Sequence, residues 1–140
     1  MTIPRQTANA LRFETPTAKD GAAMWELVSR STLDQNSAYK YIMMGHYFAE
    51  TCVLAKADNK LAGFATAFIP PGQEDVVFIW QIGVDSSQRG KGLATKMINE
   101  LIQREVCKNV RYVEATITLQ TKHLNHCSAA WRESIRPIVK

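Results

Sequence analysis

The stretch Asp85-Ser86-Ser87-Gln88-Arg89-Gly90-Lys91-Gly92-Leu93-Ala94 places two glycines, one residue apart, between a long apolar run and a helical pattern. Glycine lets a backbone approach a ligand closely, and the first turn of a helix presents amide hydrogens that no helical carbonyl accepts. The helix dipole favours an anion at that end, and Arg89 and Lys91 add positive charge. The stretch therefore predicts a cradle for a phosphate or pyrophosphate group. An alternative interpretation is a glycine-rich turn with two solvated basic side chains. The spacing of the glycines matches neither the dinucleotide-binding motif nor the P-loop, which disfavours nucleotide-binding folds of those kinds.

The segments on either side of this loop predict a strand, a helix and a second strand. Val76 to Val84 is almost wholly apolar, which indicates a strand buried on both faces. Residues 90–105 carry apolar side chains at helical spacing, and residues 110–118 read as a strand. Strand, loop, helix and strand in this order predict a right-handed crossover between parallel or nearly parallel strands.

The chain before this unit supplies the remaining elements of one α/β (α+β) domain over residues 11–118. Thr17 is a good N-cap for a helix, and Asp58-Asn59-Lys60 has the composition of a hairpin turn. The other expected elements are strands at 11–15, 51–56 and 61–69 and helices at 18–29 and 38–48. Residues 1–10 are polar without periodicity, and we expect them to be disordered.

Composition narrows the classes of protein. With 140 residues, 46% hydrophobic and 21% charged, the chain has the size and composition of a single globular domain. The net charge of +4 fits a nucleic-acid binder, a binder of a phosphate-rich ligand, or no specific partner. The compact basic cluster at 89–96 favours the phosphate ligand, so we predict no nucleic-acid partner. The three cysteines follow no motif spacing and no apolar stretch is long enough for a bilayer, so we expect a cytoplasmic protein without a membrane partner.

The glycine loop resembles the signature of the GNAT superfamily of N-acetyltransferases, which reads Q/R-x-x-G-x-G/A, and Ile82-Gly83-Val84-Asp85 resembles the end of that family's fourth strand. The resemblance implies a GNAT acyltransferase fold, a central mixed and twisted sheet with helices on both faces, and acetyl-coenzyme A as co-substrate. It also implies that strands 76–84 and 110–118 splay apart around the acetyl-pantetheine arm. The implied coenzyme-binding residues are Ile82, Gly83 and Val84 in the strand and Gln88, Arg89, Gly90, Lys91, Gly92, Leu93 and Ala94 in the loop.

A narrower resemblance, to the L-2,4-diaminobutyrate acetyltransferases, also covers residues 11–118. The segments that carry it are Leu33-Asp34-Gln35-Asn36-Ser37-Ala38-Tyr39, Phe48-Ala49-Glu50-Thr51-Cys52, Gly63-Phe64, Ile69-Pro70-Pro71, Phe78-Ile79-Trp80-Gln81 and Glu114-Ala115-Thr116-Ile117-Thr118. It implies direct acetyl transfer to the 4-amino group of L-2,4-diaminobutyrate in a ternary complex, within ectoine biosynthesis and the response to osmotic stress, by a homodimer. The alternatives are acetylation of another small amine and an inactive module that only binds acyl-coenzyme A.

The expected substrate site contains carboxylates, because an amine must lose a proton before it attacks a thioester. Asp34 and Glu114 are the candidate catalytic residues, and Trp80 could stack on the substrate cation. The full set of substrate-binding candidates is Asp34, Asn36, Tyr39, Trp80, Gln81, Glu114 and Thr116. Strand alternation predicts that Glu114 shares a face with Thr116, and Trp80 with Ile82. Plainer roles remain open: Asp34 as a helix cap, and Trp80 and Tyr39 as packing residues.

The resemblance ends at Thr118. The family continues with Pro-Ser-Asn-x-Ala-Ser and a helix, whereas this chain reads Leu119-Gln120-Thr121-Lys122-His123-Leu124-Asn125-His126-Cys127-Ser128. Back-translation with permitted codons, with one cytosine restored in the first, yields Pro-Ser-Asn-Lys-Ala-Ser-Gln-Ser-Leu-Phe. We therefore interpret residues 119–140 as a frameshifted tail that leaves the C-terminal part of the fold incomplete.

Two consequences follow from this interpretation, and the chain departs from the family in one further respect. We expect the final helix and last strands to be missing, the fifth strand to be an open edge, and the chain to have low stability and little activity. The metal-like grouping of His123, His126 and Cys127 would be accidental, so we predict no metal site. Since no tyrosine follows Tyr112, the general acid that many GNAT enzymes place after the fifth strand is unassigned.

Overall fold

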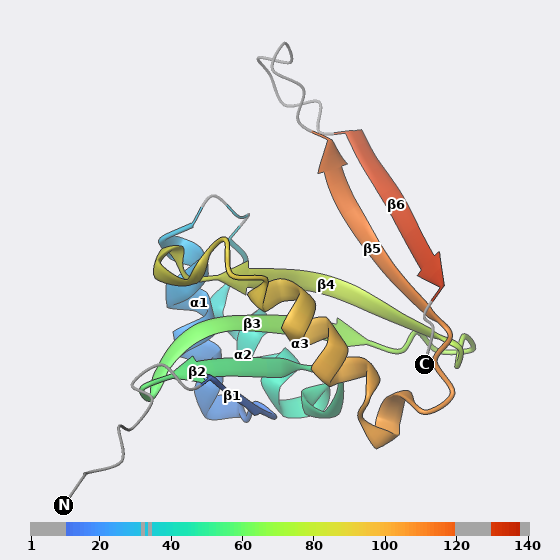
Figure 1. Cartoon of the computed structure of the whole chain (residues 1–140), viewed down its shortest axis with the longest axis horizontal. Coiled ribbons are helices and arrows are strands. Elements are labelled where there is room, and N and C mark those ends of the chain that lie inside the picture. The colour runs from blue at the N-terminus through green and yellow to red at the C-terminus, as the bar shows by residue number, and fades with distance from the viewer. Residues whose placement is uncertain (1–10, 32, 34, 120–129, 138–140) are drawn as a thin grey trace, which may run out of the picture.

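The computed structural model describes residues 11–31, 33, 35–119 and 130–137, which form one sheet and the helices that cover it (Figure 1). The strands are β1 (Leu11–Glu14), β2 (Val53–Ala57), β3 (Lys60–Phe68), β4 (Val76–Val84), β5 (Tyr112–Leu119) and β6 (Ala130–Pro137). The helices are α1 (Gly21–Ser29), α2 (Ala38–Tyr47) and α3 (Leu93–Ile102), with 3-10 turns η1 (Ala18–Asp20), η2 (Ala49–Thr51), η3 (Ser86–Gln88) and η4 (Glu105–Cys107). In this part of the chain, no helix has both the length and the apolar character needed to cross a bilayer.

The sheet is mixed, as the sequence predicts. Its strands lie in the order β1-β2-β3-β4-β5-β6, and neighbours are antiparallel except for the parallel pair of β4 and β5. Helix α3 connects these two parallel strands, which is the crossover expected from the strand, loop, helix and strand pattern.

Each face of the sheet has its own hydrophobic core. On one face α3 buries Leu93, Met97 and Leu101, which recur at helical spacing. On the other face α1 and α2 bury Met24 and Tyr41, among other side chains. Figure 1 shows α3 in front of the sheet and α1 and α2 behind it, so the prediction of helices on both faces is confirmed.

Two local signals in the sequence have the expected structural effect. Thr17 begins the first helical segment with a capping box, in which the Asp20 carboxylate accepts from the Thr17 amide at 2.8 Å. Asp58 and Asn59 take positive φ angles of 51° and 64° in the turn between β2 and β3. Such left-handed pairs match the twist of a two-residue hairpin, and asparagine and aspartate tolerate them.

The helix after the glycine loop is shorter than the predicted span of 90–105. It begins at Leu93, because Gly90 and Gly92 have φ angles of +77° and +72° and therefore lie outside the right-handed helical region. It ends at Ile102, after which the chain passes through η4 to β5.

The expectation of an open fifth strand is wrong. Strand β6 pairs with β5 in antiparallel register from Tyr112↔Pro137 to Leu119↔Ala130, so a strand does follow and covers this edge. Backbone pairing of this kind needs no particular side-chain pattern, which is why the polar composition of the tail did not reveal it. Residues 120–129, including His123, His126 and Cys127, lie outside the described part of the chain.

Arg104 connects the segment after α3 to the end of β1 and to the segment before β2. Its guanidinium group donates to three backbone carbonyl groups: Glu50 at 3.1 Å, Cys52 at a shorter distance, and Glu14 at 3.4 Å. These carbonyls belong to the end of β1 and the segment before β2, so one side chain connects three parts of the chain.

Replacing Arg104 with methionine should lower the free energy of unfolding by about 2–4 kcal/mol, because hydrogen bonds from a charged donor contribute about 1.5–3 kcal/mol each. Urea denaturation followed by circular dichroism would measure the change. Lys108→Met is the matched control, since the Lys108 side chain is 64% exposed and lies 3.3 Å from the Glu105 carboxylate of its own turn. Equal stability of both variants would show that the Arg104 contacts do not stabilise the fold.

Candidate functional site

Strands β4 and β5 separate at the centre of the sheet. They pair only from Val76↔Tyr112 to Ile79↔Ala115, although β4 continues to Val84. Beyond this point β5 rises away from β4 together with β6 (Figure 1). The predicted splay of these two strands is therefore present, and it leaves one edge of the second half of β4 without a neighbouring strand in the described part of the chain.

The peptide groups of Ile82 and Val84 point toward this gap. On the opposite edge the Asp85 amide donates to the Ala62 carbonyl at 2.8 Å, and peptide groups alternate in direction along a strand. The carbonyl of Val84 accepts from Arg89 Nε at 3.4 Å, which agrees with this direction. The last residues of β4 can therefore form backbone hydrogen bonds with an extended ligand that lies in the gap.

The glycine loop lies at the end of the same edge. A Cβ atom added to Gly90 or Gly92 would meet no other atom within 4 Å, so the space beside both residues is open. Gly92 is the N-cap of α3 and provides no side-chain acceptor for the first amides of the helix. The loop has the open backbone and amide donors that a pyrophosphate group requires.

The charges around the loop favour an anion. The Asp85 carboxylate accepts from the amide and hydroxyl groups of Ser87 and lies 3.6 Å from Arg30. The Ser87 hydroxyl is the main reason that the pKa of Asp85 is below its ordinary value. Because these neighbours engage the Asp85 charge, the exposed Arg89 and Lys91 leave the loop with a positive character.

A β-bulge in β4 determines the face of the sheet on which the side chains of Trp80 and Gln81 lie. Thr66 is opposite Gln81 and Ala67 is opposite Ile79, so Trp80 has no counterpart in β3. The extra residue turns both Trp80 and Gln81 toward α2, where the Trp80 ring lies 5.6 Å from that of Tyr41. The prediction that Trp80 shares a face with Ile82 is wrong, because Ile82 packs in the core on the α3 side.

Glu114 lies on the same face of the sheet as Trp80. Its neighbours Val113 and Ala115 pack against the α3 core, so the alternation of β5 directs Glu114 to the opposite face. It is in register with Phe78 of β4 and is half-buried. The structure thus brings Trp80, Gln81 and Glu114 together beside the point where the strands separate.

The other candidate substrate residues have different positions. Asp34 lies outside the described residues. Asn36 precedes α2 and accepts from Lys40 Nζ at 3.2 Å, while Tyr39 is 68% exposed on that helix. Thr116 follows the last residue of β5 that pairs with β4. The structure therefore places the Tyr39 side chain toward solvent.

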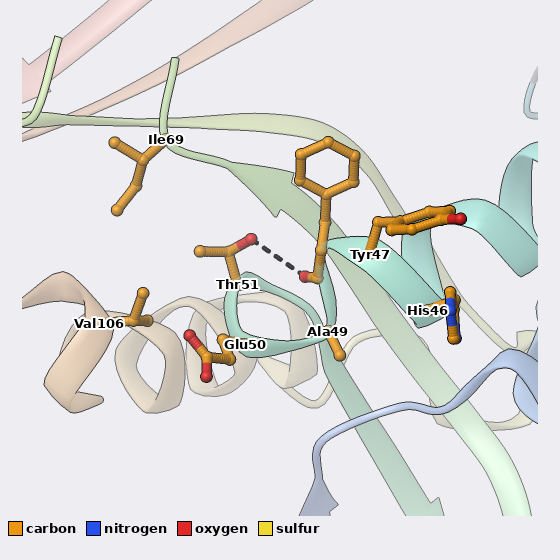
Figure 2. A pocket seen from close by; sticks show the side chains of 8 residues that line it. His46, Tyr47, Ala49, Glu50, Thr51, Ile69 and Val106 are labelled. Carbon is orange, nitrogen blue, oxygen red and sulfur yellow. Dashed lines mark hydrogen bonds between the residues drawn. The ribbon is translucent and has the colours of Figure 1, made fainter. Parts of the chain in front are cut away.

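Two hollows are lined in part by α2 and the segment that follows it. One, of about 380 Å³, is lined by Lys40, Met43, Met44, Phe48, Phe68, Ile69, Pro71 and Trp80 and therefore adjoins the face just described. The other, of about 420 Å³, is lined by His46, Tyr47, Phe48, Ala49, Glu50, Thr51, Ile69 and Val106 (Figure 2). It lies beyond the end of β3 that pairs with Phe78, whereas the glycine loop follows the end of β4 that pairs with Gly63.

Sequence reasoning missed the role of Tyr41. Its helical spacing with other apolar residues indicates a packing residue, and it is indeed fully buried. Its hydroxyl group, however, donates to Gln81 Oε1 at 2.8 Å. The sequence holds no local signal for this contact, because the two residues are 40 positions apart.

Comparison with known proteins agrees with this geometry. Residues 21–129 match the acetyltransferase (GNAT) family. The chain is 63% identical over 119 residues to the L-2,4-diaminobutyric acid acetyltransferase of Halalkalibacterium halodurans, an alignment that covers 85% of this chain and 63% of that protein. It is 60% identical over 118 residues to the protein of the same name from Marinococcus halophilus, covering 84% of this chain and 69% of that one. The chain thus spans slightly less than two thirds of the length of the first relative and slightly more than two thirds of the length of the second.

The fold is also similar to that of a solved diaminobutyrate acetyltransferase structure. The diaminobutyrate acetyltransferase of Paenibacillus lautus, in complex with its substrate L-2,4-diaminobutyric acid and coenzyme A, superposes with a TM-score of 0.76 at 36% sequence identity. The match covers 79% of this chain and 67% of that one.

Proposed function

The chain belongs to the GNAT acetyltransferase family, and from this premise we propose that it transfers the acetyl group of acetyl-coenzyme A to the 4-amino group of L-2,4-diaminobutyrate. The observation that carries the proposal is the position of Trp80, Gln81 and Glu114 beside the gap between β4 and β5. The glycine loop lies at the end of the same gap and has open space beside Gly90 and Gly92, which supports a phosphate site next to the amine site.

In this proposal the coenzyme lies along β4. The amides of residues 89–94 hold its pyrophosphate group, and the peptide groups of Ile82 and Val84 pair with the pantetheine arm. The open space beside Gly90 and Gly92 and the direction of the β4 peptide groups support this placement. Once bound, acetyl-coenzyme A supplies the thioester that the amine attacks.

Glu114 prepares the amine. An alkylammonium group has a pKa near ~10.4, so holding it neutral at about pH 7.5 costs about 4 kcal/mol unless the site helps. Glu114 attracts the ammonium group and accepts its proton, directly or through a water molecule. Trp80 forms the wall of the site and stacks on the cation, with Asp34, Asn36, Tyr39 and Thr116 as the further substrate contacts.

The buried cysteines support direct transfer. Burial raises the pKa of the Cys52 thiol to about 11, and its side chain is fully buried. Cys107 is also buried, in η4. Because both thiols are buried, neither is accessible to a thioester, so the two described cysteines do not serve as acetyl carriers.

Turnover with defined diamines tests the proposed function. Release of coenzyme A is measured for the 140-residue chain and for a version expressed after insertion of one cytosine in the Leu119 codon. We expect kcat/KM for L-2,4-diaminobutyrate to exceed that for putrescine by at least about tenfold, with faster turnover in the frame-restored version. Coenzyme binding without diaminobutyrate-dependent release in either version would instead identify an acyl-coenzyme A binder.

We also propose that residues 119–140 follow a shifted reading frame, since the resemblance to the family ends at Thr118 while its continuation can be encoded one base away. Sequencing the gene across the Thr118 codon tests this proposal. A leucine codon at position 119 with no family sequence in the shifted frame would contradict it.

The biological setting belongs to the same proposal. We place the reaction in ectoine biosynthesis during osmotic stress, in the cytoplasm, and expect the active form to be a homodimer. Light scattering after size-exclusion chromatography measures the oligomeric state, and a monomer at micromolar concentration that retains full activity would contradict the dimer.

A further inference from the structure

The hollow of about 380 Å³ beside α2 combines an apolar wall with one charged group. Lys40 is the only charged side chain among the described residues that line it, and the others are apolar or aromatic. Sites for small molecules typically have volumes of about 300–1,000 Å³ and a mostly apolar lining, in which a few polar groups fix the orientation of the ligand. The hollow therefore has the size and lining of a site for a small ligand with a negative group.

Helix α2 places Lys40 at this hollow. Lys40 lies three residues before Met43 and four before Met44, so all three are on one side of the helix, and all three line the hollow. The Lys40 ammonium group donates to Oδ1 of Asn36 at 3.2 Å, which holds the end of the side chain near the start of α2. An ammonium group has three N–H donors, so one contact with an amide oxygen still allows it to bind a carboxylate.

The sheet side of the hollow belongs to the candidate amine site. Trp80 lines the hollow and lies on the same face of the sheet as Glu114. Phe68 lines it as well, and its ring centroid lies 5.3 Å from that of Phe78, the residue in register with Glu114. A positive group thus lies on the α2 side of the hollow, and a negative group lies next to its sheet side.

We infer that this hollow is the pocket for the amino acid substrate and that Lys40 binds the substrate carboxylate. The inference rests on the proposed function, because it concerns the same site. The carboxylate accepts hydrogen bonds from the Lys40 ammonium group, the methylene groups lie against the apolar wall, and the 4-amino group reaches Trp80 and Glu114. Lys40 therefore selects diamino acids over diamines, because it attracts a carboxylate and repels a ligand that carries only ammonium groups.

Two ligands separate this role from a general effect on the fold. L-2,4-diaminobutyrate and 1,3-diaminopropane differ only in the carboxylate, and calorimetry measures the binding of each to the 140-residue chain saturated with coenzyme A. Lys40→Met removes the charge at an exposed position and keeps a side chain that suits a helix. It should weaken binding of the amino acid about tenfold, as expected for a lost hydrogen bond between charged groups, and should leave binding of the diamine unchanged or tighter.

Lys60→Met is the matched control, because it removes the same charge at an exposed position in the hairpin between β2 and β3. Neither affinity should change by more than about twofold, since salt screens a charge at this distance. Lys40→Glu should reverse the preference, because the new carboxylate repels that of the amino acid and attracts the diamine. An unchanged preference in Lys40→Met and Lys40→Glu, or an equal loss for both ligands in Lys40→Met, would overturn the inference.

A further variant tests the hollow itself. Met43→Trp places a larger side chain in the space and should weaken binding of both ligands at least about tenfold, because little room is left for either. Tyr47→Trp is its control, since Tyr47 is 73% exposed on the same helix and does not line this hollow. Unchanged binding of both ligands in Met43→Trp would overturn the inference by placing the substrate elsewhere.

Turnover by the parental chain is measured separately, so that the inference and the proposed function can fail independently. Binding of the amino acid that depends on Lys40, without acetyl transfer, contradicts the proposed function only. Acetyl transfer to diaminobutyrate with an affinity that does not depend on Lys40 contradicts the inference only. A parental chain that binds neither ligand also overturns the inference.

Discussion

Replacing Glu114 with glutamine is expected to lower kcat/KM for L-2,4-diaminobutyrate by roughly 10²- to 10³-fold and to leave coenzyme affinity within about twofold. Glutamine keeps the shape of the side chain but can neither balance the ammonium charge nor accept its proton. Removing one partner from a buried ion pair costs about 3–5 kcal/mol, which corresponds to this loss of rate. Glu114 is half-buried and faces the Trp80 side of the sheet, so solvent replaces it poorly.

The variant should be measured in whichever version of the chain turns over faster, beside a matched control. Glu26→Gln makes the same chemical change at an exposed position of α1 and should leave kcat/KM unchanged. The defect of Glu114→Gln should also shrink above about pH 9, because more of the amine is then already neutral. Near-parental kinetics at pH 7.5, or a defect of the same size at every pH, would mean that Glu114 does not accept the proton.

The position of Glu114 was predictable from the sequence, whereas that of Trp80 was not. In β5 a single polar residue stands between Val113 and Ala115, so alternation alone assigns its face. In β4 the bulge resets the alternation, but apolar residues lie on both sides of the strand before and after it. A one-residue shift leaves no mark in the hydropathy of a strand that is buried on both faces.

The boundaries of helices and strands were likewise predictable only where the sequence carries a local signal. The hairpin after β2 was predictable, because Asp58 and Asn59 are residues that tolerate left-handed turns. The start of α3 was placed three residues too early, because glycine gives no periodic signal and its φ angle depends on the loop that surrounds it. Strand β6 was not expected at all, since its pairing with β5 uses backbone groups that every residue except proline carries.

The glycine loop gives the other large effect. Gly92→Val should weaken acetyl-coenzyme A binding by roughly 2–4 kcal/mol, or about 30- to 1,000-fold in Kd. Gly92 has a φ angle of +72°, which a branched residue adopts only with strain. Any Cβ atom at this position projects into the open space beside the loop, where we place the pyrophosphate group. The side chain would therefore clash with the ligand or force the loop to move its amides.

Backbone strain alone must be separated from the loss of the phosphate site. Gly72 provides the control, because it has a φ angle of +80° and equally open surroundings but lies in the turn between β3 and β4. Gly72→Val and Gly92→Val should lose similar amounts of thermal stability, since both force valine into the left-handed region. Only Gly92→Val should lose coenzyme affinity by calorimetry. If the two variants bind acetyl-coenzyme A equally well, the pyrophosphate group does not lie against this loop, because no ligand held there could avoid the new side chain.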